Sequence, residues 1–257
     1  MLSRAKAVYL ATRKRHDQLF NRFLMRPLAA LVVVVLGRTP VTPNQLTLLN
    51  VVMFAVAAGL LIALPDYAGG LWAIGVLEAS YLFDCADGML ARHKQLASKQ
   101  GHLFDFFTDE IKAVMLAGAL GVRLWRTGGW GIDAQPWPAA DGRFLLAAVA
   151  AVAVIASATS LTNFVRRPEM TGKETPVEAH YETVERGRER SALRRVLSLG
   201  ATFLRFLNHY PSHLWLFAIA ARLDLFFWIY ASINLLYLGR GWLGLALRFG
   251  RFGAPPN

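Results

Sequence analysis

Over residues 84–109 the chain reads D-C-A-D-G-M-L-A-R-H-K-Q-L-A-S-K-Q-G-H-L-F-D-F-F-T-D. As a pattern this stretch is D-x2-D-G-x2-A-R-x8-G-x3-D-x3-D. Apolar residues precede it over residues 71–83 and follow it over residues 113–124. Its own central part, residues 93–100, is polar. The stretch therefore predicts two antiparallel membrane helices joined by a polar turn.

The fixed positions of the pattern fall on one face of each predicted helix. Five of them follow the i, i+3, i+4, i+7, i+8 spacing of a single helical stripe: Asp84, Asp87, Gly88, Ala91 and Arg92. Three more step by four residues along the second helix: Gly101, Asp105 and Asp109. We expect the two adjacent helices to bring the four carboxylates together.

Four carboxylates in a low dielectric require compensating protons or cations. With oxygen ligands and no nearby cluster of Cys or His, the site favours Mg2+, Mn2+ or Ca2+ over zinc, and a pair of metal ions suits phosphoryl transfer. Gly88 and Ala91 leave room for a large ligand beside the metals, and Arg92 can pair with a phosphate. The alternative is that Gly88, Ala91 and Gly101 only serve helix packing.

This pattern resembles the signature of the CDP-alcohol phosphotransferases, or CDP-alcohol phosphatidyltransferases, which are integral membrane enzymes of phospholipid synthesis. Every fixed position of the signature is present. Upstream, residues 38–47 read R-T-P-V-T-P-N-Q-L-T, which is similar to the T-P-N-x-x-T segment at the family's first transmembrane helix. Beyond about residue 125 only the hydrophobic layout matches.

The resemblance implies two divalent cations, Mg2+ or Mn2+, held by Asp84, Asp87 and Asp105. It makes Asp109 a further metal ligand and the general base. It also implies a homodimer. The residues that would contact the CDP moiety are Asn44, Thr47, Gly88, Ala91, Arg92 and Ser98.

The composition indicates a membrane protein independently of the motif. Hydrophobic residues make up 55% of the 257 residues and the mean hydropathy is +0.36, both high for a soluble domain. Apolar stretches cover residues 46–64, 71–83, 113–124, 144–161 and 199–247. The last is long enough for two helices with a break near Arg222 and Asp224. We predict an all-α integral membrane protein, with about six transmembrane helices in a domain over residues 41–250.

Residues 1–40 are expected to form a basic juxtamembrane segment before this domain. They contain no long apolar run of the kind found in a cleaved signal peptide. Apolar residues such as Tyr9, Leu10 and Phe23 alternate with basic ones, which favours an amphipathic helix at the membrane surface over a disordered tail. Residues 28–36 are too short to cross a membrane.

The distribution of basic residues predicts the orientation. Lysine and arginine gather in residues 1–44, in the turn of the motif and in residues 166–195, whereas residues 65–70 have none and residues 125–142 contain only Arg126. The positive-inside rule then places the N-terminus and the motif turn in the cytoplasm. We expect the metal site at the cytoplasmic edge of the cell (inner) membrane, where cytosolic nucleotides and alcohols reach it.

The net charge of +11 and the pI of about 10.3 do not point to nucleic acid. The excess of positive charge lies in segments that flank the membrane. Attraction to anionic membrane lipids and to phosphorylated substrates explains it more simply.

A second group of polar residues is a candidate for binding the acceptor alcohol. Arg205 and His209 lie on one face at the start of the fifth span, and Arg166 and Arg167 end the fourth span on the same side. An arginine cluster favours an anionic or phosphorylated alcohol. The alternative is that the arginines pair with one another or extend to lipid headgroups.

Two further residues in the apolar helices are interpreted as structural. Cys85 lies off the stripe of the acids and is expected to pack in the core. Glu78 is also off that stripe, which favours a structural hydrogen bond or ion pair.

The predicted reaction transfers a phosphatidyl group from a CDP-linked lipid, CDP-diacylglycerol above all, to the hydroxyl of a small polar alcohol with release of CMP. Glycerol phosphate, inositol phosphate, inositol and serine all remain open as acceptors. One alternative reverses the donor: a CDP-choline- or CDP-ethanolamine-type molecule gives its phosphoamine to diacylglycerol. Another is a divalent-cation transporter, which would spread its carboxylates across the membrane depth.

Overall fold

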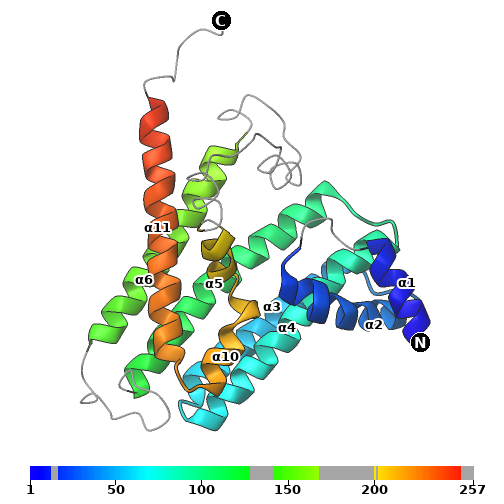
Figure 1. Cartoon of the computed structure of the whole chain (residues 1–257), viewed down its shortest axis with the longest axis horizontal. Coiled ribbons are helices and arrows are strands. Elements are labelled where there is room, and N and C mark those ends of the chain that lie inside the picture. The colour runs from blue at the N-terminus through cyan, green and yellow to red at the C-terminus, as the bar shows by residue number, and fades with distance from the viewer. Residues whose placement is uncertain (13–16, 128–141, 168–199, 201, 250–257) are drawn as a thin grey trace, which may run out of the picture.

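The computed structural model describes residues 1–12, 17–127, 142–167, 200 and 202–249. All regular elements in these residues are helices, which confirms the predicted all-α class (Figure 1). Most of the two loops at residues 125–142 and 166–195 lies outside the described residues. In chain order the elements are α1 (Leu2–Thr12), the π-helix η1 (Asn21–Met25), α2 (Arg26–Leu36), α3 (Pro43–Ala63), α4 (Tyr67–His93), α5 (Lys99–Thr127), α6 (Arg143–Arg166), the 3-10 helix η3 (Tyr210–Ser212), α10 (Leu214–Ile219) and α11 (Leu223–Phe249).

The start of α3 is fixed by a capping box. The Thr42 hydroxyl accepts from the backbone N–H of Gln45 at 3.3 Å, and the Gln45 side chain accepts from the backbone N–H of Thr42 at 2.9 Å. Pro43 occupies the first turn, where its missing N–H has no intrahelical partner to lose. These hydrogen bonds fix where α3 begins, and so fix the positions of Asn44 and Thr47 in its first turns.

The turn at the corner between α4 and α5 is shorter than the polar segment over residues 93–100 that the sequence predicted. Helix α4 continues to His93 and α5 begins at Lys99, so that only residues 94–98 form the turn. Gln95 has a φ of 58°, which lets the chain reverse direction. Lys94 Nζ donates to the carbonyls of Thr39 at 2.6 Å and Val41 at 2.8 Å. The corner is therefore tied to the segment between α2 and α3.

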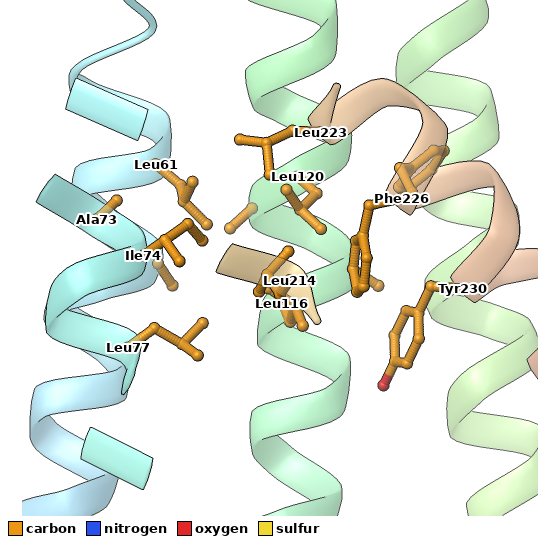
Figure 2. Packing of buried hydrophobic residues seen from close by; sticks show 14 of the residues in the cluster. Leu61, Ala73, Ile74, Leu77, Leu116, Leu120, Leu214, Leu223, Phe226 and Tyr230 are labelled. Atoms are coloured by element: carbon orange, nitrogen blue, oxygen red, sulfur yellow. The ribbon is translucent and has the colours of Figure 1, made fainter. Parts of the chain in front are cut away.

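The main core lies between α3, α4, α5, α6, α10 and α11. Leu77 from α4, Leu116 from α5 and Phe226 from α11 are each at most 1% exposed and lie in the same cluster (Figure 2). Helices α5 and α6 approach closely at Gly121, where an added Cβ would lie 2.2 Å from the Cβ of Ala148. Close contacts of this kind between small residues are common in membrane helices.

A second cluster joins the N-terminal helices to the motif end of α4. Val8 of α1 and Val33 of α2 are buried together with Cys85, Met89 and Leu90. Cys85 is thus a buried packing residue with a free thiol, as predicted. In Figure 1 α1 and α2 lie on the opposite side of the molecule from α11. The N-terminal segment therefore packs beside the functional motif.

The last apolar stretch is broken twice. The predicted break near Arg222 is confirmed, since α10 ends at Ile219 and α11 begins at Leu223, with Ala221 at a φ of 55°. The helix before it is not continuous, which the sequence analysis did not foresee: residues 202–208 are helical, η3 follows, and α10 is only six residues long. Pro211 in η3 cannot donate a backbone hydrogen bond and disfavours the α conformation at Tyr210.

Large apolar side chains cover the outside of several helices. Val52 on α3, Trp72 on α4, Leu146 on α6 and Leu243 on α11 are each more than half exposed. Within the described residues, two helices are long and apolar enough to cross a membrane, over Pro43–Ala63 and Arg143–Val165. An apolar exterior of this kind fits a lipid environment.

Candidate active site and metal centre

The motif carboxylates meet where α4 and α5 face each other. Asp84, Asp105 and Asp109 each offer an oxygen, and these oxygens lie within 4.8 Å of one another. The side chain of Asp84 is 15% exposed and that of Asp109 is 53% exposed, so the cluster runs from the protein interior to its surface. An oxygen-only set at this spacing fits hard divalent cations such as Mg2+ or Mn2+. The helical spacing thus predicted this juxtaposition correctly.

Asp87 lies deeper than the other three acids. It is 4% exposed and interacts electrostatically with Asp84 and Asp105. Its Oδ2 accepts a 2.6 Å hydrogen bond from the Thr47 hydroxyl of α3. Thr47, which is predicted to contact the nucleotide, is in the structure also a hydrogen-bond partner of a predicted metal ligand. Its side chain therefore orients Asp87 from the neighbouring helix.

A buried polar chain from α3 and α4 supports Asp84. Asn50 Nδ2 donates to Asp84 Oδ1 at 2.7 Å, and the Ser80 hydroxyl donates to Asn50 Oδ1 at 2.5 Å. Asn50 and Ser80 are both fully buried. Sequence reasoning missed both residues, because they lie inside apolar stretches and the partner of each comes from the other helix.

Lys112 is the other residue that sequence reasoning missed. Its Nζ lies 2.5 Å from Asp84 Oδ1 and 2.7 Å from Asp109 Oδ1, and its side chain is only 2% exposed. A signal was present, since Lys112 follows Asp105 and Asp109 at the i, i+4, i+7 spacing of one helix face. The site is therefore made of carboxylates with one buried ammonium among them.

Two predicted nucleotide residues, Asn44 and Ser98, lie together at the α4–α5 corner. A Cβ added to Gly101 would lie 3.2 Å from Ser98 Oγ and 3.3 Å from Asn44 Oδ1. Ser98 Oγ also accepts from the backbone N–H of Gly101 at 3.0 Å. The absent side chain of Gly101 thus allows two polar side chains from different elements to approach each other.

Gly88, Ala91 and Arg92 lie on the last turns of α4. A Cβ added to Gly88 would meet Arg92 Nη1 at 3.7 Å and Nη2 at 3.9 Å, so the glycine faces the guanidinium. Arg92 Nε donates to the Thr12 carbonyl of α1 at 3.0 Å. The N-terminal helix thereby helps to orient the arginine that was predicted to meet the phosphate.

The residues predicted to bind the acceptor lie in different environments and have different hydrogen-bond partners. His209 shares a 2.8 Å hydrogen bond with Tyr81 Oη and a 2.6 Å hydrogen bond with Ser212 Oγ, and Tyr81 lies one turn before Asp84 on α4. Arg205 is exposed and donates to Thr202 Oγ1 at 3.2 Å. Arg167 is exposed just after α6, and the side chain of Arg166 lies outside the described part of the chain.

The expectation for Glu78 was wrong. Both of its carboxylate oxygens are buried, and among the described residues neither has a hydrogen-bond partner. Among the described residues, Glu78 therefore lacks the structural hydrogen bond or ion pair that was expected of it.

A carboxylate cluster suited to divalent cations is typical of enzymes that transfer phosphoryl groups. Here the helices that carry the cluster also carry a glycine that faces an arginine. The family model for CDP-alcohol phosphatidyltransferase matches residues 40–246, and the chain belongs to this family. A search of curated proteins found no match. Family membership makes the chain a membrane-embedded transferase of phospholipid metabolism, which uses a CDP-linked donor and divalent cations and releases CMP. It does not support the transporter alternative.

Proposed function

We propose that this protein transfers a phosphatidyl group from CDP-diacylglycerol to the hydroxyl of a small polar alcohol or alcohol phosphate. The observation that carries the proposal is the convergence of Asp84, Asp105 and Asp109 within 4.8 Å, beside the stripe with Gly88 and Arg92. This arrangement joins a site for cations with an open surface and a guanidinium, which is what a nucleotide pyrophosphate requires.

The donor would lie with its lipid tails in the bilayer and its CDP headgroup at the α4–α5 corner. Arg92 would pair with the pyrophosphate, and the bare backbone at Gly88 would let it approach α4. Asn44 and Ser98, which meet at Gly101, offer hydrogen bonds to the rest of the nucleotide. Ala91 adds little bulk on the same stripe.

Asp84, Asp87, Asp105 and Asp109 would hold two divalent cations, Mg2+ or Mn2+. When bound, these ions would neutralise phosphate charge and stabilise the charge that develops on the phosphoryl oxygens. Thr47 and Asn50 hold two of the ligands in place through hydrogen bonds of 2.6 and 2.7 Å. Such outer partners commonly fix ligand orientation.

Asp109 is the proposed general base. It is the most exposed acid of the cluster that it forms with Asp84 and Asp105, and an acceptor that arrives from the aqueous side can reach it. Its carboxylate would take the proton from the acceptor hydroxyl as that oxygen attacks the lipid-side phosphorus, and CMP would leave. Positioning and electrostatics supply most of the acceleration in such a reaction.

The acceptor would bind between the cluster and the segment that contains Arg205 and His209. His209 supports this placement, because Tyr81 links it to the helix that carries Asp84. Arg205 would offer positive charge to the acceptor, and Arg166 and Arg167 at the end of α6 are further candidates for this role. A phosphorylated alcohol such as glycerol phosphate or inositol phosphate suits this charge better than serine or inositol.

We further propose about six membrane spans over residues 41–250, with the site at the cytoplasmic edge of the cell membrane. Residues 1–40 would lie at the surface of that membrane, where exposed Leu10 and Phe23 would contact lipid. The positive-inside pattern of the loops supports this orientation. The resemblance to the family supports a homodimer.

The second candidate within the family is transfer of a phosphoamine from a CDP-amino alcohol to diacylglycerol. A soluble CDP-amino alcohol would then occupy the corner, and diacylglycerol would be the acceptor. Arg205 favours the first candidate, because diacylglycerol has no charge for it to bind.

The test is CMP release by purified protein in liposomes, with Mn2+ or Mg2+ and a matrix of donors and alcohols. We expect release with CDP-diacylglycerol and one polar alcohol, and none from Asp109→Asn. Release only with CDP-choline or CDP-ethanolamine and diacylglycerol would establish the second candidate instead. Folded protein that releases no CMP from any donor would refute both.

A further inference from the structure

We propose that Lys112 is a built-in counter-ion of the metal site, which competes with divalent cations for Asp84 and Asp109. The inference rests on the proposed function, because it takes these two carboxylates as metal ligands. Lys112 has no place in the signature, and its contribution comes from its position on α5, one turn after Asp109.

The ammonium uses acceptor positions that a metal ion needs. Lys112 Nζ lies 2.5 Å from Asp84 Oδ1, and the same oxygen accepts from Asn50 Nδ2 at 2.7 Å. A carboxylate has about four lone-pair sites on its two oxygens, or about two on each. Both sites of Asp84 Oδ1 are therefore in use, and a cation can bind that oxygen only by displacing one donor.

Asp109 is restricted by the same lysine. Its Oδ1 lies 2.7 Å from Lys112 Nζ, so one ammonium occupies one oxygen of each of two proposed ligands. A divalent cation that enters between Asp84 and Asp109 meets a positive charge at hydrogen-bond distance from both. Like charges this close repel strongly where water is scarce.

Lys112 cannot leave the cluster easily. Its side chain is 2% exposed, and the next turn of α5 presents the fully buried Leu116. Because a buried ammonium is costly without a counter-charge, Lys112 depends on Asp84 and Asp109 as much as they depend on it.

This arrangement has two opposite effects. When divalent cations are scarce, Lys112 neutralises part of the acidic cluster and stabilises the folded protein. When they are abundant, it lowers the affinity of the site for them. Replacing Lys112 by a neutral side chain should therefore tighten metal binding and weaken the metal-free protein at the same time, a combination that loss of a merely structural residue would not produce.

The experiment measures Mn2+ binding by electron paramagnetic resonance of free Mn2+, and thermal unfolding in EDTA and in saturating Mn2+. We expect Lys112→Met to bind Mn2+ at least about tenfold more tightly, since a tenfold change corresponds to only about 1.4 kcal/mol and the removed repulsion should exceed it. Its melting temperature should fall in EDTA and rise further than that of the wild type when Mn2+ is added. Lys112→Arg should retain values close to those of the wild type.

The matched control is Lys94→Met, because Lys94 also makes two short hydrogen bonds, but to the backbone carbonyls of Thr39 and Val41. This change should leave the Mn2+ affinity unaltered. An unchanged or weaker Mn2+ affinity in Lys112→Met would overturn the proposal.

If Lys112→Met does not fold, the comparison moves to the Asp109→Asn background, where the lost ammonium is balanced by a lost carboxylate. The double variant should bind Mn2+ more tightly than Asp109→Asn alone, and equal binding would overturn the proposal. If the variants with and without Lys112 bind Mn2+ equally, and the wild type releases CMP only with metal, the role of Lys112 alone is refuted. Failure of every form to bind Mn2+ would refute the metal site as well.

Discussion

Replacing Gly88 by alanine should impair donor binding and leave the fold intact. Among the described residues, the added Cβ would meet only Arg92, at 3.7 Å from Nη1 and 3.9 Å from Nη2, which are ordinary van der Waals contacts. Alanine inside a helix is also favoured over glycine by about 0.5–1 kcal/mol. Thermal unfolding should therefore show a variant at least as stable as the wild type.

The donor should nevertheless bind more weakly, because the methyl group would occupy the space between the backbone of α4 and the pyrophosphate. If the displacement costs one charge-assisted hydrogen bond to Arg92, the loss is about 1.5–3 kcal/mol, or roughly ten- to hundredfold in donor affinity. The assay is the KM for CDP-diacylglycerol from CMP release, with the affinity for Mn2+ measured in parallel. The Mn2+ affinity should not change.

Gly75→Ala is the matched control, since Gly75 lies on the same helix and a Cβ there would meet nothing within 4 Å among the described residues. It should leave the KM unaltered. An unchanged KM in Gly88→Ala would refute the idea that the donor approaches the helix at this point. A lower melting temperature in Gly88→Ala alone would instead show that the glycine serves helix packing.

Three further changes test other parts of the site. Asp109→Asn should abolish CMP release while CDP still binds in isothermal titration, and full activity would exclude Asp109 as the base. Thr47→Val removes the 2.6 Å hydrogen bond to buried Asp87 and should weaken Mn2+ binding by roughly ten- to hundredfold; Thr47→Ser should restore it, and equal affinity in the valine variant would count against the orienting role. Arg205→Ala should raise the KM for a phosphorylated acceptor but not for an uncharged alcohol, and the same KM for both proteins would remove Arg205 from the pocket.

The sequence predicted the centre of the site because helix geometry is local. Asp84 and Asp87 on one helix, and Asp105 and Asp109 on the next, are each brought to one face by spacing alone. Because the polar turn between them is short, the two helices must lie side by side. The capping residues Thr42 and Gln45 belong to the same class of local signal.

What the sequence did not predict depends on packing between helices. Asn50 and Ser80 support Asp84 only because α3 and α4 meet at a particular rotation, which no single-helix pattern specifies. Lys112 differs from them, because its spacing from Asp109 placed it on the acidic face. It directly precedes the apolar stretch over residues 113–124, which hides its charge in a pattern based on hydrophobicity.

The broken helix before α11 shows a related error. The apolar stretch over residues 199–247 predicted a continuous helix before the break near Arg222, yet Pro211 lies within that first part, and the structure has a 3-10 turn there. This interruption places His209 against Tyr81 and so beside α4. A proline within an apolar run was the available signal, and it marks the part of this stretch that contacts the site.

The most direct test of the account is the metal dependence of CMP release in wild-type protein and in Asp105→Asn. We predict that EDTA abolishes CMP release by the wild type, that added Mg2+ or Mn2+ restores it, and that no metal concentration restores it in the variant. Continued CMP release in EDTA, or full activity of Asp105→Asn, would contradict the claim that these carboxylates form a catalytic metal centre.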